Sequence, residues 1–220
     1  MKILLIDTCG DVGSVALADT EGTVLKVWGA ALPGRSASER LIATVRELAL
    51  SGEVQLADLR AIAVVNGPGS FTGVRVGVSA AKGLCEALQV PLVAISRLAV
   101  LAEGHGPGRL IAALDAGRGE FYCGVYEDGR CVHEALLGGA EVEGIANRGG
   151  LLACEPRVLE ALAELAPVAV DAPTAEAALP IALRRIAAAE FDDVATLDAN
   201  YLRRTDAEIF AKQEAARARV

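Results

Sequence analysis

The stretch that decides the fold reads Asn66-Gly-Pro-Gly-Ser-Phe-Thr-Gly-Val-Arg-Val-Gly77. Small and β-branched residues precede it at positions 61–65 and predict a buried strand. After it, apolar residues recur at helical spacing, at Val74, Val78, Ala81, Leu84 and Leu88. The stretch is therefore predicted to be a glycine-rich turn that joins a strand to a helix.

Such a turn has two interpretations. It can hold an anion, because free backbone N–H groups and the positive end of the helix dipole point at one place. It lacks the lysine of a P-loop, since Val74 follows Gly73, and Thr72 stands where the dinucleotide motif needs its third glycine. The other interpretation is a structural turn whose glycines permit positive φ and close packing. The candidate cofactor-binding residues are Asp7, Gly67 and Gly69.

The length indicates one or two domains, and the composition, with few aromatic residues, indicates an aliphatic core. The 220 residues are 53% hydrophobic and carry a net charge of −8. A chain that held nucleic acid by itself would show a basic patch, so direct nucleic-acid binding is not expected. No apolar run approaches the roughly 20 residues that cross a bilayer, and no signal peptide is predicted. The five scattered cysteines fit free thiols in a reducing cytoplasm.

The predicted elements repeat around a glycine-rich linker at 104–108. Before the linker we expect three strands, a helix with Ser38 as its N-cap, the strand and turn described above, a further strand and a short helix capped by Ser96. The outline then starts again, because 110–115 echoes 3–7 and a second hairpin follows. The sequence predicts two duplicated units, 1–103 and 109–220.

The second unit is predicted to be looser than the first. Its later elements are two strands, two helices and a C-terminal helix from Asp206, which is a candidate to pack back on the first unit. The predicted ranges are 151–154 and 168–171 for the strands, and 156–165 and 174–189 for the helices.

No catalytic constellation emerges from the residues. His105 lies in the linker and His133 in a hairpin strand, and neither has a partner at metal-ligand spacing. Ser70 is not in a G-x-S-x-G elbow. Asp7, Asp115 and Glu120 could act as acids or bases, but a strand-end Asp more often organises a turn by accepting hydrogen bonds from nearby backbone N–H groups. We therefore predict no catalytic residue and no metal site.

The two units resemble the actin-like ATPase superfold, an α/β fold of two RNase H-like β-β-β-α-β-α units with nucleotide between them. The resemblance implies that Asp-containing turns after both opening strands hold phosphate. The first turn, at 7–11, keeps this chemistry. The second offers bulky residues that we expect to fill the cleft, namely Arg118, Glu120, Phe121 and Tyr122. The second unit is therefore expected to be degenerate.

The glycine stretch at 67–77 also resembles the signature of the bacterial TsaB (YeaZ) family. Three further segments agree in order and spacing: Ile6-Asp7-Thr8, Asp115-Ala-Gly-Arg-Gly-Glu-Phe-Tyr122 and Tyr201-Leu-Arg-Arg204. The resemblance implies a cytoplasmic, non-catalytic scaffold of tRNA N6-threonylcarbamoyladenosine synthesis. It implies pairing with a TsaD-type transferase and a TsaE-type ATPase, a homodimer when alone, and contact with tRNA only through the complex.

The same resemblance implies that ATP and metal belong to the partner subunits and that this chain requires no cofactor. The transferase holds its metal through a His-x-x-x-His pair, and the corresponding region at 35–41 has neither histidine. The family's partner surface uses the first two helices. Its candidate residues here are Leu41, Ile42, Val45, Gly73, Gly77 and Ala80. The alternative is that these residues pack inside the domain.

Two other functions compete with the scaffold. An autonomous actin-like ATPase or small-molecule kinase would use Asp7 and the glycine turn. A peptidase follows only from an older family label, and the sequence offers neither a nucleophile–base pair nor a metal site for it.

Overall fold

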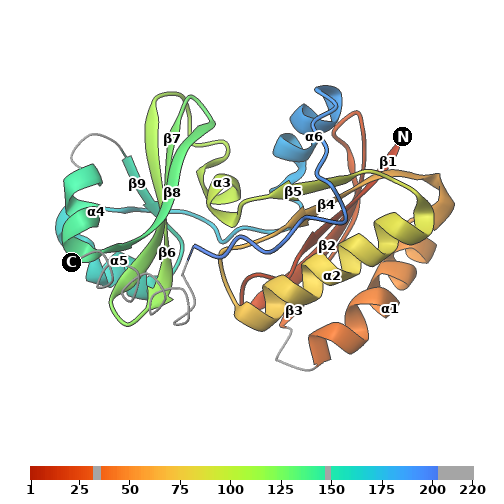
Figure 1. The fold of residues 1–220 in the computed structure, drawn as a ribbon, viewed down its shortest axis with the longest axis horizontal. Coiled ribbons are helices and arrows are strands. Elements are labelled where there is room, and N and C mark those ends of the chain that lie inside the picture. The colour runs from red at the N-terminus through yellow and green to blue at the C-terminus, as the bar shows by residue number, and fades with distance from the viewer. Residues whose placement is uncertain (32–35, 147–149, 203–220) are drawn as a thin grey trace, which may run out of the picture.

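A computed structural model of this chain describes residues 1–31, 36–146 and 150–202. Two five-stranded sheets lie side by side along the long axis of the molecule, each accompanied by helices (Figure 1). The N-terminal sheet lies to the right in this view and the second sheet to the left.

The first unit contains five strands in the order β3-β2-β1-β4-β5. The hairpin strands pair antiparallel with β1, and β4 and β5 continue the sheet in parallel. The strands are β1 (Lys2–Asp7), β2 (Val12–Asp19), β3 (Val24–Ala31), β4 (Leu59–Val65) and β5 (Leu92–Ile95). The helices are α1 (Ser36–Ser51), α2 (Phe71–Leu88) and α3 (Arg97–Ala102), with a 3-10 turn at Leu56–Asp58.

The second unit repeats this arrangement, because its sheet has the order β10-β9-β6-β7-β8 with the same parallel and antiparallel pairs. Its strands are β6 (Arg109–Gly117), β7 (Glu120–Glu127), β8 (Arg130–Gly138), β9 (Gly150–Ala153) and β10 (Val168–Ala169). Its helices are α4 (Gly139–Ala146) and α5 (Pro156–Ala161), followed by a 3-10 turn at Ala163–Leu165. Shorter helices and a two-residue last strand make it the degenerate copy, as predicted.

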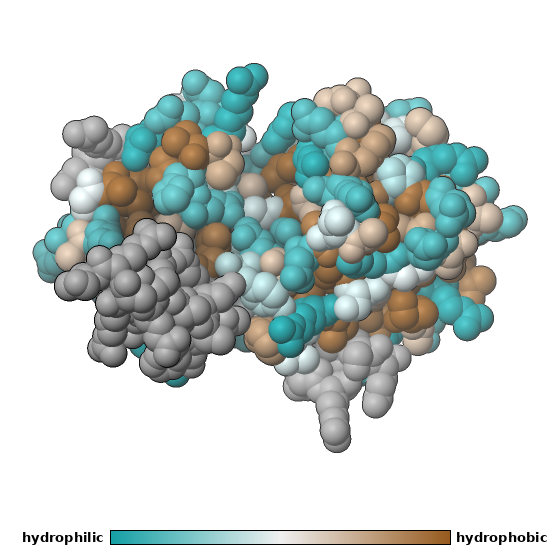
Figure 2. Space-filling view, viewed as in Figure 1, coloured by the Kyte–Doolittle hydropathy of each residue, from teal (hydrophilic) through white to brown (hydrophobic). Residues whose placement is uncertain are grey.

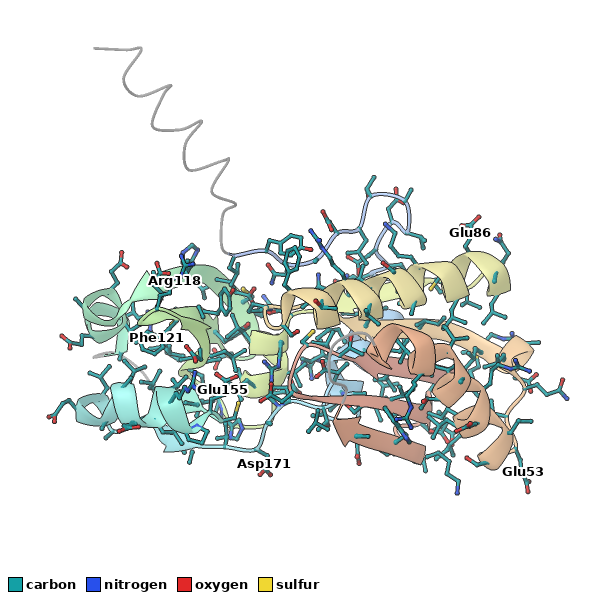
Figure 3. The ribbon with its side chains drawn as sticks, turned by 90° about the horizontal axis from the view of Figure 1, so that it is seen from below. Glu53, Glu86, Arg118, Phe121, Glu155 and Asp171 are labelled. Atoms are coloured by element: carbon teal, nitrogen blue, oxygen red, sulfur yellow. The ribbon has the colours of Figure 1, made fainter. Side chains whose placement is uncertain are left out.

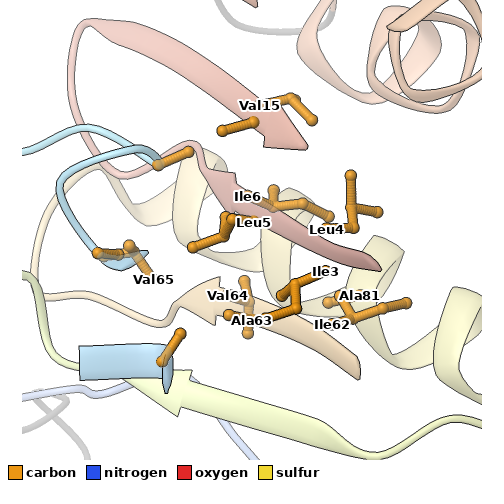
Figure 4. Packing of buried hydrophobic residues seen from close by; sticks show 14 of the residues in the cluster. Ile3, Leu4, Leu5, Ile6, Val15, Ile62, Ala63, Val64, Val65 and Ala81 are labelled. Atoms are coloured by element: carbon orange, nitrogen blue, oxygen red, sulfur yellow. The ribbon is translucent and has the colours of Figure 1, made fainter. Parts of the chain in front are cut away.

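The core of the first unit forms around β1, whose residues from Ile3 to Ile6 are all buried (Figure 4). A strand buried on both sides needs cover on both faces of the sheet. Helices α1 and α2 cover one face, and α6 (Leu179–Ala187) lies over the other (Figure 1). This explains the continuous apolar sequence of β1.

The two units exchange helices. On β6, Ile111 and Ala113 face the core beneath α4 and α5, whereas Ala112 and Leu114 pack against Leu98 of α3. Helix α3 therefore covers the second sheet, although it follows the first in sequence. Ala175 and Ala178, which precede α6, and Leu179 and Ala182 at its start join the first core. The sequence predicts that residues 109–220 form the second unit, but these four residues pack on the first.

The element boundaries differ from prediction in several places. Helix α1 begins at Ser36, so Ser38 lies inside the helix and is not its N-cap. The predicted helix at 156–165 is interrupted, and the one at 174–189 begins only at Leu179. The helix α4 was not predicted. The C-terminal helix from Asp206, together with Arg203 and Arg204 of the last family segment, lies outside the described residues.

Within the described part of the chain, no helix combines the length and apolar character that crossing a membrane would require.

Candidate functional site

The aspartates that end β1 and β6 organise equivalent turns. Asp7 Oδ1 accepts a hydrogen bond of 2.8 Å from the Cys9 N–H, and Asp115 Oδ1 accepts one of 2.7 Å from the Gly117 N–H. Each carboxylate thus binds the backbone two residues on, which is the Asx turn expected for a strand-end Asp. The repeated turn is a local sign of the duplication.

The glycine turn packs directly against the turn after β1. A Cβ on Gly69 would lie 2.4 Å from the Cys9 carbonyl oxygen, and one on Gly73 would lie 2.0 Å from the Thr8 carbonyl oxygen. A Cβ on Gly77 would meet Thr8 Oγ1 at 2.3 Å. Because these distances are shorter than any real Cβ contact, only glycine lets α2 approach so closely.

Two backbone donors at the start of α2, the N–H groups of Ser70 and Gly73, already have partners inside the chain. The Ser70 N–H donates to the Cys9 carbonyl at 2.8 Å, and the Ser70 side chain caps the helix by accepting from Gly73 N–H. Gly67 has a φ of +108°, and its carbonyl accepts from Arg97 N–H at 2.7 Å. These bonds assign Gly67 and Gly69 packing roles and favour the structural turn over the anion cradle.

Asp7 is almost completely buried, with 1% of its surface exposed. Burial raises the pKa of its carboxyl group, while the charge of Arg97 and the hydrogen bond from Cys9 oppose that shift. Its Oδ2 has no hydrogen-bond partner among the described residues. The carboxylate is sealed beneath the turn and does not line an open cavity.

Arg97 lies between the turns of the two units. The residue is 6% exposed, and its Nη1 lies 3.7 Å from Glu155 Oε1. Glu155 in turn accepts a short hydrogen bond from the Asp115 N–H of the second turn. On the other side, Arg97 Nη2 is 2.8 Å from the place where a Cβ on Gly10 would stand. The guanidinium thus occupies the space between the turns.

The residues around this guanidinium are a poor fit for a phosphate group. Burial raises the pKa of Glu155, and the nearby charges of Asp115 and Asp11 raise it further, against the Asp115 hydrogen bond and Arg97. Several carboxylates, those of Glu155, Asp115 and Asp11, therefore lie around a single buried cation, Arg97. A phosphate placed here would be repelled by these carboxylates, and the Arg97 guanidinium already occupies the space beside Gly10.

The bulky residues of the second turn do not gather in the cleft as expected. Phe121 turns into the core beneath α4 and α5, while Tyr122 packs at the junction with α3. Arg118 lies exposed at the tip of the β6–β7 turn (Figure 3). The prediction that these side chains fill the cleft is therefore wrong for Phe121 and Arg118; strand alternation sends Phe121 and its neighbour Tyr122 to opposite faces. Arg97 fills it instead.

Within the described residues, no three His, Cys, Asp or Glu side chains could hold a metal ion together. His105 and His133 are both exposed. Among the cysteines, Cys9 is buried and donates its thiol to the Val65 carbonyl, and burial raises its pKa well above the ordinary value. It has the environment of a structural thiol, not of a nucleophile.

The six predicted interface residues divide into two sets. Leu41 and Val45 are each 1% exposed in the first core, and Gly73 and Gly77 face Thr8. These four pack inside the chain. Ile42 is 40% exposed and Ala80 is half-buried, so only these two are open to a partner on the α1–α2 face.

A stripe of small residues runs along the outer side of α2. It consists of Val76, Ala80, Gly83 and Ala87, which recur at helical spacing; Gly83 and Ala87 are exposed, whereas Val76 and Ala80 are half-buried and pack partly against the first core. A Cβ on Gly83 would meet no atom within 4 Å. A glycine inside a helix costs roughly 0.5–1 kcal/mol relative to alanine, and no contact among the described residues requires it here.

The extended segment at 190–202 runs along α2 toward the junction of the units (Figure 3). Lys82 Nζ donates to the Leu197 carbonyl, and the Asn200 N–H donates to the Asn66 carbonyl. At its end, Tyr201 accepts a hydrogen bond of 2.6 Å from Arg75 Nε, and the Arg75 guanidinium stacks on the Phe71 ring at 3.7 Å. These contacts fix the segment on α2.

A separate hollow of about 1170 Å³ opens between the units beside α6 and the β7–β8 hairpin (Figure 2). Four of the charged residues on its wall form two ion pairs, Arg184 with Glu103 and Arg185 with Glu190. Glu134 accepts hydrogen bonds from Tyr126 and from Asn200, which again joins the units. The hollow offers no convergent set of unpaired polar groups among the described residues.

Sequence reasoning missed Arg97 and Glu155. Each stands at the start of a short helix, where a single charged residue is common on protein surfaces and therefore gives no sign of a buried ion pair. The one available signal is that Arg97 directly follows a buried strand and a capping serine in an otherwise apolar region.

A family model described as "TsaD: tRNA N6-adenosine threonylcarbamoyltransferase" matches residues 31–175, more than half of the chain. The chain is similar to the tRNA threonylcarbamoyladenosine biosynthesis protein TsaB of Escherichia coli K12. The two are 37% identical over 131 residues, which are 58% of this chain and 55% of that protein. The match thus spans about half the length of that relative.

Solved structures extend the similarity along the chain. YeaZ from Pseudomonas aeruginosa superposes with a TM-score of 0.76 at 32% identity, over 91% of this chain and 99% of that one. The ethanolamine utilization protein EutJ from Carboxydothermus hydrogenoformans superposes at 0.54 with 13% identity, over 83% and 90%, and shares the fold alone. With its duplicated actin-like fold, this chain belongs to the TsaB (YeaZ) family.

Proposed function

We propose that this chain acts in the biosynthesis of tRNA threonylcarbamoyladenosine as a non-catalytic subunit that binds and supports a TsaD-type transferase. Family membership supports the pathway, since relatives carry that name. The filled cleft supports the non-catalytic role, because Asp7 is buried and the Arg97 side chain occupies the space between the two turns in which a nucleotide phosphate would have to bind. A cytoplasmic location is part of the proposal.

The observation that carries the partner role is Gly83. The outer side of α2 keeps a helix-destabilising glycine with open space around it, beside Ala80 and Ala87. Small residues let a second helix approach closely and bury more surface. We propose that this stripe, with Ile42 of α1, contacts the helices of the partner, or of a second copy when the chain is alone.

This surface predicts a specific loss of binding. Gly83→Leu should weaken the complex with the transferase at least tenfold, because the added side chain holds the helices apart. The complex is measured by size-exclusion chromatography and by calorimetric titration of the two purified subunits. The matched control is Gly144→Leu, since Gly144 also lies exposed in a helix with no atom within 4 Å of its Cβ position. It should bind like the natural chain.

Two results would count against the proposal. Absence of any complex between the natural subunits at micromolar concentration would exclude the scaffold role. Equal affinity of Gly83→Leu and Gly144→Leu would keep the scaffold but move its surface elsewhere.

The cofactors of the reaction are proposed to lie on the partners. This chain alone should neither hydrolyse ATP nor modify tRNA, whereas a reconstitution with TsaD-type and TsaE-type partners should form the modified adenosine. ATP turnover by the isolated chain that Asp7→Ala abolishes would favour the ATPase interpretation instead.

A further inference from the structure

The two units meet at α3, whose first residue is Arg97. The apolar side of α3 packs on the second sheet through Leu98 and Leu101. Its backbone is tied to the first unit, because Arg97 N–H donates to the Gly67 carbonyl of the glycine turn. Any change in the angle between the units must therefore move Arg97 relative to one of its neighbours.

The Arg97 side chain contacts both units. Toward the first unit it lies against Gly10, and its positive charge acts on the buried Asp7. Toward the second unit it pairs with Glu155, which follows β9 and stands at the N-cap of α5, at the end of the helix that faces the first unit (Figure 3). Glu155 is fixed in turn by the hydrogen bond from the backbone of Asp115.

The burial of the Arg97 guanidinium makes its contacts with carboxylates energetically important. A guanidinium that is 6% exposed needs carboxylates close by, since an unpaired buried charge is strongly destabilising. Glu155 of the second unit forms the ion pair with Arg97, and Asp7 of the first unit also attracts it, although the burial of the Asp7 carboxylate outweighs that attraction. Separation of the units would remove one of these carboxylates and leave the cation undercompensated.

We propose that Arg97 ties the two units together across the cleft and fixes their relative orientation from within the chain. A hinged two-unit protein needs a bridging ligand to hold its closed form, whereas here a side chain supplies the bridge. The α1–α2 face and the second unit then move as one rigid body. The tether does not depend on the proposed function, because it concerns the free chain.

The test measures the distance between the units directly. Nitroxide labels are attached at the exposed positions 86 on α2 and 160 on α5 through encoded azide residues, which leaves the native cysteines unlabelled. Double electron–electron resonance then gives the distance distribution. Arg97→Met should widen it at least twofold, Glu155→Gln should widen it in the same way, and Arg97→Lys should restore part of the natural width.

The matched control is Arg109→Met. Arg109 forms an ion pair of 3.1 Å with Glu127 inside the second unit, and its Nε, like that of Arg97, is buried without a partner in the described chain. Loss of this pair should leave the width unchanged. A merely structural role for Arg97 would lower the melting temperature without altering the distance distribution.

The outcomes decide the proposal. Folded Arg97→Met with the natural width overturns it. If Arg97→Met does not fold, Glu155→Gln carries the test, because the amide keeps an oxygen for the Asp115 N–H and loses only the charge. A natural width in Glu155→Gln then overturns the proposal, and a widened one supports it. Partner binding is not measured, so failure of the scaffold role would not affect the result.

Discussion

At the scale of single residues, Asp7 shows how the same carboxylate can serve a catalytic fold or a structural turn. One oxygen accepts the Cys9 N–H, the other has no hydrogen-bond partner among the described residues, and burial raises the pKa. A nucleophile or metal ligand would face a cavity. This carboxylate faces the packed base of the glycine turn, which agrees with an organising role.

The raised pKa of Asp7 predicts a pH-dependent effect of Asp7→Asn. The folded state binds the proton more readily than the unfolded state, so Asp7 favours folding below its ordinary pKa of 3.8 and loses that contribution as pH rises through the folded pKa. Asn cannot ionise. The variant should match the natural melting temperature near pH 4 and exceed it by a few degrees near pH 8, measured by thermal unfolding.

The control for this experiment is Asp11→Asn, which removes the same charge from an exposed position in the same loop. It should show no comparable gain at pH 8. A melting temperature of Asp7→Asn that falls below the natural value as pH rises would mean that the ionised carboxylate stabilises the fold.

At the scale of elements, helix α2 carries glycines on two sides, and those on one side are tightly packed whereas the one on the other side is not. Gly73 and Gly77 face inward, where the Thr8 backbone and side chain leave no space for a Cβ. Gly83 faces outward, into open space. The sequence shows three glycines in one helix, and only their neighbours distinguish them.

Two alanine substitutions in this helix should therefore have opposite signs. Gly73→Ala should lower the free energy of unfolding by about 1–3 kcal/mol, because the new Cβ must displace the Thr8 carbonyl. Gly83→Ala should raise it by roughly 0.5–1 kcal/mol through helix propensity alone. Urea denaturation measures both. Equal effects would show that α2 does not pack on the β1 turn as described.

At the scale of the whole molecule, the exchanged helices make each unit depend on the other. Ser14 Oγ in β2 accepts a hydrogen bond from Ala175 N–H, and Ala178 and Leu179 join the first core. Helix α3 makes the reciprocal contact with the second sheet. Neither sheet is covered on both faces by its own stretch of sequence.

This dependence predicts that the chain unfolds as one cooperative unit. Differential scanning calorimetry should show a single transition whose calorimetric and van't Hoff enthalpies agree. A fragment of residues 1–108 lacks the cover from residues 175–187, so it should bind the dye ANS through its exposed apolar face. Two separate transitions, or a stable fragment that leaves ANS unbound, would contradict the exchange.

Local pattern was sufficient for much of the fold. The strand–turn–helix around residues 66–77, the Ser96 cap and the repeated Asx turns depend on residues that are neighbours in sequence. The boundaries in the second unit were less accurate, because Pro156–Ala161 and Leu179–Ala187 are short helices stabilised by packing. Ser38 was misplaced because serines at 36 and 38 both suit a helix start.

The sequence by itself determined the duplicated architecture and the family, since periodicity and a glycine signature are written in consecutive residues. Tertiary structure alone decided which glycines pack inward, which unit α6 covers and what fills the cleft. The physical reason is distance along the chain: Ser14 and Ala175 are 161 residues apart, and Arg97 meets Glu155 only when both sheets have formed. Such partners leave no periodic trace in a sequence.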